Sequence, residues 1–216
     1  MKRGPRLMDL YRAMLDALGP SRWWPADTPF EVMVGAILTQ NTSWANVAKA
    51  LDNLRSADLL DPARLHGLEL DELAERIRPA GYFRLKAQRL KHYLDFLAQA
   101  DFDLTALAER DTLALREDLL AVRGIGPETA DSILLYALGH PVFVVDAYTR
   151  RIASRHGLVP EDIDYHELQS FFADALDPDP GLFNEYHALL VRVGHTWCKK
   201  TKPDCVACPL GPLLET

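Results

Sequence analysis

The sequence has only three cysteines, and all of them lie between residues 198 and 208. Cysteines placed so close together do not form the disulfide framework of a small secreted domain. The chain also lacks an apolar run long enough to cross a membrane, and no signal peptide opens it. We therefore expect a cytoplasmic protein that has no membrane partner.

The sequence also lacks an excess of basic residues. It has 24 Lys and Arg but 31 Asp and Glu, which gives a net charge of −7. Nucleic-acid-binding domains are usually basic, so this total argues weakly against such a partner. The distribution of charge is compatible with DNA, since two basic clusters contain no acidic residue; alternating charges on solvated helices are the other interpretation. The first cluster is Arg84, Lys86, Arg89 and Lys91, and the second is Arg192, Lys199, Lys200 and Lys202.

Strand signals are almost absent. VFVV at 142–145 is the one strand-like run, and it is too short and too isolated to build a sheet. Helical spacing of apolar residues dominates instead, and it predicts an all-α protein. We expect helices at 7–18, 30–54 with a break near 40–42, 71–77, 84–99, 112–121, 127–138, 147–156, 165–176 and 182–197.

Proline- and glycine-rich segments divide this helical pattern into two expected domains. The first covers residues 28–140 as a six-helix, barrel-type domain, and the second combines residues 1–27 with 141–216. A hydrophobic content of 48% is enough for two small cores.

The stretch VRGIGPETADS at 122–132 predicts a tight hairpin between two helices, together spanning 112–138. Gly124 and Gly126 allow a positive φ and leave backbone N–H groups uncovered, and Pro127 suits the first position of a helix. Such N–H groups at a helix N-terminus attract a phosphate. The helix–hairpin–helix frame favours a DNA phosphate bound by Gly124, Ile125 and Gly126, although glycines also end helices for purely structural reasons.

Together with ILTQNTSW at 37–44 and VVDAYTRR at 144–151, this hairpin resembles the HhH-GPD superfamily of base-excision DNA glycosylases, which includes endonuclease III. The resemblance runs from about residue 28 to the C-terminus. It implies an active-site cleft between the two domains, with Asp146 as the catalytic carboxylate that stabilises an oxocarbenium-like state and activates water. An aspartate at this place is otherwise a helix N-cap.

The resemblance also assigns residues that contact DNA. Gln40 matches the residue that fills the gap left in the base stack, although a polar residue here is also typical of a helix end. Two further candidates come from the first basic cluster and not from the resemblance: Arg84 and Lys86 are expected to bind DNA. The resulting partner is double-stranded DNA with a damaged base, bound by a monomer.

Glu128 occupies the position at which the bifunctional members of the superfamily carry a lysine. A carboxylate cannot form a Schiff base, so we expect a monofunctional enzyme without AP lyase activity. Trp24 and Trp44 are candidates for stacking on the flipped base, and a cationic N-alkylated purine stacks well on indole. The sequence looks most like the bacterial 3-methyladenine glycosylases. The alternatives are an endonuclease III-type enzyme for oxidised pyrimidines, with or without weak lyase activity, and a non-catalytic damage-binding module.

The cysteine loop at 198–208 leaves three alternatives open. Cys198, Cys205 and Cys208 have the spacing of the first three ligands of the superfamily's [4Fe–4S] loop, but Leu214 stands at the fourth position. A cluster could use Glu215 or water as its fourth ligand. Zinc could instead bind the three cysteines together with His195, since Cys₃His is a common structural set. The third alternative is a loop without metal.

Overall fold

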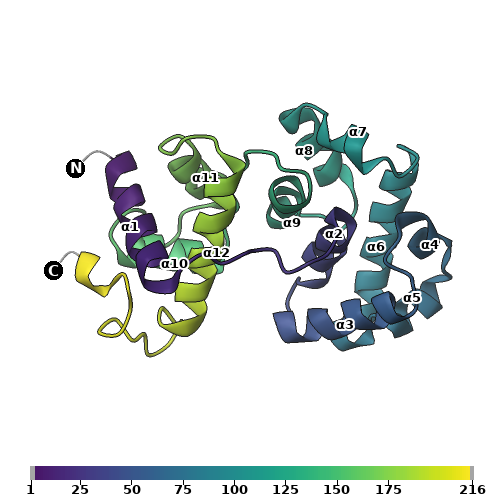
Figure 1. Cartoon of the computed structure of the whole chain (residues 1–216), viewed down its shortest axis with the longest axis horizontal. Helices are drawn as coiled ribbons and strands as arrows, with labels where there is room; N and C mark the ends of the chain where they lie inside the picture. The colour runs from purple at the N-terminus through teal and green to yellow at the C-terminus, as the bar shows by residue number, and fades with distance from the viewer. Residues whose placement is uncertain (1–2, 215–216) are drawn as a thin grey trace. The chain divides into compact units, whose positions relative to one another are not determined.

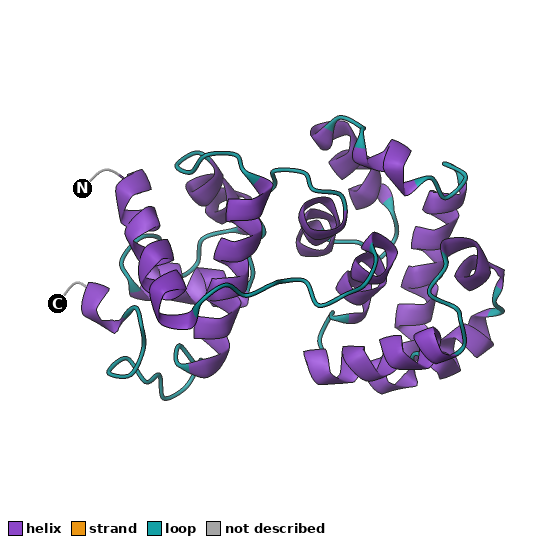
Figure 2. Cartoon of the chain, viewed as in Figure 1, coloured by secondary structure: helices purple, strands orange, loops and turns teal. Residues whose placement is uncertain are grey.

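The computed structural model describes residues 3–214, and in that range it consists of helices and their connections, as Figure 2 shows. The all-α prediction is confirmed. Residues 142–145 form no strand within the described range. No helix in the described part of the chain has both the length and the apolar character that a membrane span requires.

The chain divides into two compact units. We call residues 24–140 the hairpin unit, and the residues before 24 together with those after 140 the aspartate unit. The sequence analysis placed the first boundary at residue 28.

A helix that is apolar except for Glu31 forms the centre of the hairpin unit. α2 (Pro29–Leu38) is buried along almost its whole length, as expected for a helix that is hydrophobic on every face. It packs against α3 (Trp44–Ser56), α6 (Phe83–Ala98), α9 (Pro127–Ser132) and the π-helical turn η2 (Ile133–Ala137) (Figure 1). The other helices of the unit are α4 (Pro62–Gly67), α5 (Leu70–Arg76), η1 (Arg78–Ala80), α7 (Leu104–Ala108) and α8 (Thr112–Ala121).

The short helices α4 and α7 have no counterpart among the expected helices. Each begins with an aspartate, Asp61 or Asp103, whose side chain accepts a hydrogen bond from a backbone N–H of the first turn. These N-caps are a sequence signal for a helix start. The helices are too short to show an apolar period, which explains why spacing did not predict them.

The aspartate unit contains α1 (Arg3–Leu18), α10 (Ala147–Arg155), α11 (Tyr165–Ala173), α12 (Pro180–Thr196) and η3 (Gly211–Leu213), with α12 packed against α1 and α10. Its core includes the four aromatic rings of Phe143, Phe172, Phe183 and Tyr186. Phe143 stacks on Phe172 with ring centroids 4.6 Å apart, and both meet Tyr186 edge-on. Tyr186 also donates a hydrogen bond to the carbonyl oxygen of Leu7 at 2.7 Å. Phe143 thereby anchors the segment that leads directly to Asp146.

His140, at the end of the hairpin unit, is buried, and its Nδ1 lies 2.8 Å from the hydroxyl of Thr112. Burial lowers the pKa of His140 below 6.5, and the nearby charge of Asp111 opposes this shift less strongly. As pH falls below 6.5, the unfolded chain therefore binds a proton before the folded one does. The stability that His140 contributes is present above that pH and is lost as pH falls.

We therefore expect the free energy of unfolding to fall as pH is lowered from about 7.5 to 5, and to fall less steeply in His140→Gln, which cannot titrate. Denaturant unfolding at several pH values measures both slopes. Equal slopes for the two proteins would show that His140 carries none of the pH dependence.

Candidate active site and nucleic-acid interface

The hairpin between α8 and α9 requires glycine at Gly124 for two reasons. Its φ is +95°, a conformation that other residues rarely adopt, and a Cβ atom there would lie 2.4 Å from Cγ of Arg89. Gly126 differs, because it caps α9 with φ −98° and ψ 176°, an ordinary extended conformation. The expected use of a positive φ therefore applies to Gly124 and not to Gly126.

A buried ion pair holds the two helices of this hairpin together. Arg116 on α8 donates to both carboxylate oxygens of Asp131 on α9, at 2.6 and 3.0 Å, and Asp131 is fully buried. Ile125 is buried at the tip of the hairpin, and its N–H donates to the carbonyl oxygen of Val122 at 3.0 Å. Bidentate pairing fixes orientation as well as distance, so the hairpin has one defined geometry.

Gln40 lies on this hairpin. It follows α2 in a short loop where Asn41 has a φ of +54° and interrupts the helical run. The Gln40 amide nitrogen donates to the carbonyl oxygen of Gly124 at 3.2 Å and to the hydroxyl of Thr129 at 2.9 Å. Its amide oxygen accepts from Arg89. The structure thus brings two of the predicted DNA-binding elements, Gln40 and the hairpin, into direct contact.

The expected DNA contact of Lys86 is wrong. Its side chain is 1% exposed, and its ammonium donates to the carbonyl oxygens of Leu38 at 2.9 Å and Ala80 at 2.7 Å. Burial, followed by the neighbouring Arg89, lowers the pKa of Lys86. An ammonium enclosed in this way cannot reach a phosphate.

Other members of the two basic clusters also bind carbonyl groups. Lys91 donates to the carbonyl oxygen of His66 at 2.6 Å, and Arg192 donates to those of Leu18 and Gly19, each at 2.8 Å. Arg84 is exposed on α6, and its DNA contact stays a prediction. Lys199, Lys200 and Lys202 are exposed in the C-terminal loop. The basic clusters therefore serve the fold at several positions and offer charge to a partner at others.

The two predicted pocket residues, Trp24 and Trp44, belong to one aromatic cluster. Their rings meet edge to face with centroids 5.2 Å apart, and Tyr136 adds a third ring 5.4 Å from Trp24. All three side chains are half-buried. Gly35 leaves room for this arrangement, because a Cβ there would lie 3.3 Å from the Trp24 indole. Tyr136 was missed, since its place in an apolar helical stretch gives no sign of its neighbours.

Asp146 is the N-cap of α10, and its two carboxylate oxygens have different surroundings. Oδ1 accepts hydrogen bonds from the backbone N–H of Thr149 at 2.7 Å and from its hydroxyl at 2.9 Å. Oδ2 lies 3.8 Å from Nε2 of His187 on α12. The Asp146 side chain keeps 12% of its surface exposed. The hydrogen bonds to Oδ1 fix the Asp146 side chain and cap the helix, and Oδ2 takes no part in the cap.

His187 was missed by the sequence analysis, because a single histidine in an apolar helix is usually a core residue. Burial lowers the pKa of His187, while the charge of Asp146 acts in the opposite direction and more weakly. We therefore describe the imidazole as neutral near pH 7. A neutral neighbour does not cancel the negative charge of Asp146.

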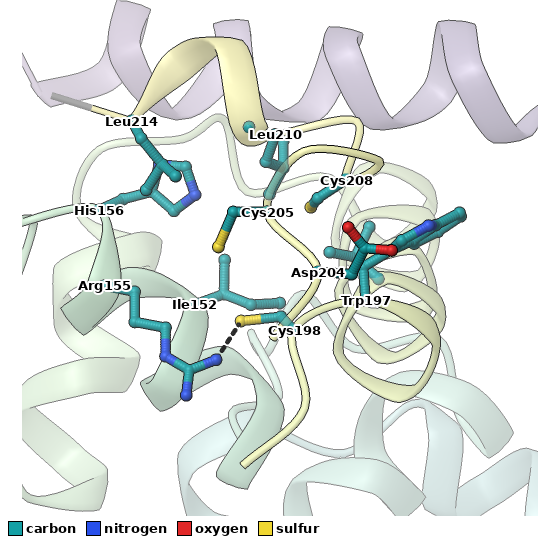
Figure 3. Close-up of a pocket in the computed structure, with 12 residues that line it drawn as sticks. Ile152, Arg155, His156, Trp197, Cys198, Asp204, Cys205, Cys208, Leu210 and Leu214 are labelled. Atoms are coloured by element: carbon teal, nitrogen blue, oxygen red, sulfur yellow. Dashed lines mark hydrogen bonds between the residues drawn. The ribbon is translucent and has the colours of Figure 1, made fainter. Parts of the chain in front are cut away.

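The three cysteines line one small cavity of about 20 Å³ in the aspartate unit, and Leu214 lines it too (Figure 3). An N–H of Arg155 lies 3.2 Å from Sγ of Cys198. Burial raises the pKa of the Cys208 thiol, although hydrogen bonds from the main chain at Leu210 and Gly211 partly oppose this. Donors directed at sulfur are compatible with thiolate ligands.

The described residues nevertheless complete neither kind of metal site. Among them, no three His, Cys, Asp or Glu side chains form a group that could hold a metal ion. His195, which the zinc alternative needs, is exposed and does not line the cavity. Leu214 offers no ligand atom, and Glu215 lies outside the described residues. The three cysteines therefore line one cavity together with Asp204 and His156, but the described side chains do not come together as a set of metal ligands.

Two arginines on α10 attach the beginning of the cysteine loop to the protein. Arg151 donates to the carbonyl oxygen of Cys198 at 2.6 Å. Arg155, one turn later, donates to the carbonyl oxygens of Lys199 at 2.8 Å and Lys200 at 3.2 Å. Because these hydrogen bonds join protein atoms, they attach residues 198–200 of the loop directly to α10.

We expect Arg155→Met to loosen the loop, because it removes the hydrogen bonds to Cys198, Lys199 and Lys200. Limited trypsin digestion should then cleave after Lys199 or Lys200 about tenfold faster, as expected for the loss of about 1.4 kcal/mol of local stability. Arg150→Met is the matched control, since Arg150 is exposed on the same helix. Equal cleavage rates in both variants would contradict an anchoring role.

The paired helices α8 and α9 with their glycine hairpin define a helix–hairpin–helix protein. Comparison with protein families agrees, because the model for HhH-GPD superfamily base excision DNA repair proteins matches residues 34–178. The chain belongs to the HhH-GPD superfamily and is a DNA repair glycosylase of that superfamily.

Relatives of known sequence or structure fit this assignment. A protein of Methanocaldococcus jannaschii, provisionally assigned as a DNA repair glycosylase, is 47% identical over 203 residues, which cover 93% of this chain and 92% of that protein. The 3-methyladenine DNA glycosylase of H. pylori, solved with 1,N6-ethenoadenine, has a TM-score of 0.75 and 30% identity, and covers 90% of this chain and 98% of its own. Endonuclease III in a DNA complex has a TM-score of 0.82 at 22% identity, over 98% of this chain and 95% of its own, which shows the shared fold.

Proposed function

We propose that this protein hydrolyses the N-glycosidic bond of a damaged base in double-stranded DNA, that it has no AP lyase activity, and that its substrates are N-alkylated purines such as 3-methyladenine. The observation that carries the proposal is the geometry of the Asp146 carboxylate. Thr149 binds its Oδ1, whereas its Oδ2 is not bound by Thr149 and lies 3.8 Å from Nε2 of His187. The superfamily assignment supports the reaction class, and the protein works as a cytoplasmic monomer.

The chemistry requires a fixed negative charge beside the sugar. Breaking the bond between base and deoxyribose builds positive charge on the sugar, and a carboxylate stabilises that charge and orients the attacking water. Asp146 fits this need because Thr149 holds Oδ1 in place, and we infer that Oδ2 is the oxygen that faces the sugar. The neutral His187 leaves the charge of the carboxylate intact.

In this proposal the hairpin unit binds the DNA backbone. We infer that the backbone N–H groups at Gly124 and Gly126, together with the first turn of α9, bind a phosphate, and that exposed Arg84 adds charge. The target base must leave the stack, which costs a few kcal/mol and is easiest for a damaged base. Gln40 then fills the gap.

The aromatic cluster of Trp24, Trp44 and Tyr136 supports an alkylated purine as the substrate. Electron-rich rings attract a cationic base more strongly than a neutral one. Such a base is also a good leaving group, so one carboxylate is sufficient for its removal. The similarity to the H. pylori 3-methyladenine glycosylase over most of both chains favours the same class. An oxidised-pyrimidine glycosylase, with or without weak lyase activity, and a non-catalytic damage-binding module are the competing assignments.

Base release from methylated duplex DNA tests the reaction. Asp146→Asn should lower the single-turnover rate of 3-methyladenine release by about 10²–10⁴-fold, because asparagine caps the helix but cannot supply the charge or accept a proton. Asp162→Asn, an exposed acid in the same unit, is the matched control and should retain full activity.

Duplexes with ethenoadenine, thymine glycol, uracil opposite guanine and thymine opposite guanine complete the substrate panel. Release from a pyrimidine substrate alone would reject the alkyl-purine assignment. Binding to damaged duplexes without any base release would favour the damage-binding module.

Borohydride trapping tests the absence of lyase activity. The wild-type protein should give no covalent adduct with DNA, because Glu128 cannot form the imine that borohydride reduces. An adduct with the wild-type protein would contradict a monofunctional mechanism. Glu128 is exposed, so Glu128→Lys should fold and should generate an adduct if this position faces C1′ as the superfamily resemblance implies.

The cofactor part of the proposal is an iron–sulfur cluster held by Cys198, Cys205 and Cys208, with zinc or no metal as alternatives. The described residues contain no group of three or more ligand side chains that could hold a metal ion, so no catalytic step is assigned to a metal. Iron, sulfide and zinc contents of the purified protein distinguish the three alternatives.

A further inference from the structure

The Gln40 amide is fully engaged by its neighbours in the hairpin unit. A glutamine amide has two N–H donors and one acceptor oxygen. The nitrogen donates to the carbonyl oxygen of Gly124 and to the hydroxyl of Thr129, and the oxygen accepts from Arg89. Because a guanidinium can only donate and a backbone carbonyl can only accept, the amide has one allowed orientation.

Arg89 reaches Gln40 by passing over the hairpin. A Cβ atom on Gly124 would lie 2.4 Å from Cγ, 3.0 Å from Cδ and 3.2 Å from Nε of Arg89. The whole aliphatic stem of Arg89 therefore runs across the bare backbone of this glycine. Gly124 provides the passage for Arg89 in addition to its positive φ.

The backbone that carries Gln40 is held by the same helix. Lys86, one turn before Arg89 on α6, donates to the carbonyl oxygen of Leu38 at the end of α2. Gln40 follows Leu38 by two residues. Thus α6 fixes the main chain leading to Gln40 through Lys86 and the side chain of Gln40 through Arg89.

We propose that Arg89 is a positioning residue that holds the Gln40 side chain against the hairpin before DNA is bound. This inference rests on the proposed function of Gln40 in filling the gap in the base stack. A free glutamine side chain loses several rotamers when it is ordered at an interface, and this loss weakens binding. In this protein the ordering occurs on folding, and the gap-filling side chain is tied to the phosphate-binding hairpin as one rigid piece.

The test compares two duplexes, one undamaged and one with a tetrahydrofuran abasic-site analogue, so it does not depend on which base the enzyme removes. The measured quantity is the ratio of the two Kd values. Gln40→Ala and Arg89→Met should each lower the preference for the abasic duplex by about tenfold, the effect expected from ordering one long side chain. The double variant should lose no more than either single variant, because Arg89 acts through Gln40.

Two further variants separate positioning from charge. Arg64→Met removes an equal charge from an exposed position on α4 and should leave the preference unchanged. Arg89→Lys retains a long side chain and a hydrogen-bond donor, so this variant should keep part of the preference for the abasic duplex. A direct phosphate contact by Arg89 predicts something else: Arg89→Met would weaken both duplexes equally and reduce the salt slope of binding by about one. That result would overturn the proposal.

The outcomes also separate this inference from the function on which it rests. A normal preference in Gln40→Ala would reject gap filling by Gln40. If Gln40→Ala lowers the preference but Arg89→Met has no effect, the positioning role of Arg89 is rejected and gap filling is not. The same holds if the effects of the two substitutions add in the double variant. Thermal unfolding of each variant checks the fold. If Arg89→Met does not fold, Thr129→Val removes another partner of the Gln40 amide and is subject to the same comparison.

Discussion

The bidentate ion pair between Arg116 and Asp131 is the interaction on which the hairpin depends. It joins α8 to α9 across the turn, and removing Arg116 would leave a buried carboxylate without its counterion, at a cost of about 3–5 kcal/mol. With the two helices fixed, the connecting residues have little freedom. Ile125 turns into the core and Gly124 takes a positive φ. The phosphate contacts proposed for Gly124, Gly126 and the first turn of α9 start from that geometry.

The cations of this acidic protein are divided between structure and binding. Lys86 donates hydrogen bonds to two backbone carbonyl oxygens, and Arg89 donates to the amide oxygen of Gln40. Arg192 donates to the carbonyl oxygen of the last residue of α1. Charge patterning along the sequence could not make this division, because it depends on which carbonyl oxygens lie opposite each side chain. A run without acidic residues predicted a basic surface, but of its four cations Lys86 is buried, Arg89 and Lys91 are half-buried, and Arg84 alone is exposed.

Local signals predicted the fold and part of the candidate site. Helical spacing, N-caps and the glycine–proline turn act over a few residues, so the all-α fold and the hairpin were accessible from sequence. The proximity of His187 to Asp146 and of Tyr136 to Trp24 was not, because each pair is brought together by packing of separate helices. Asp146 illustrates both cases: its capping role follows from local sequence, whereas the surroundings of Oδ2 follow from the tertiary structure.

Helix α10 connects the carboxylate to the cysteine loop. Asp146 caps its first turn, and Arg151 and Arg155 near its end bind carbonyl groups of the loop. The bonds to carbonyl oxygens involve no candidate ligand atom, although Arg155 also donates to Sγ of Cys198. The first residues of the loop are thus attached to α10 by hydrogen bonds between protein groups. The placement of Asp146 depends on its bonds to Thr149 and on the packing of α10 against α12, and neither contact involves a cysteine.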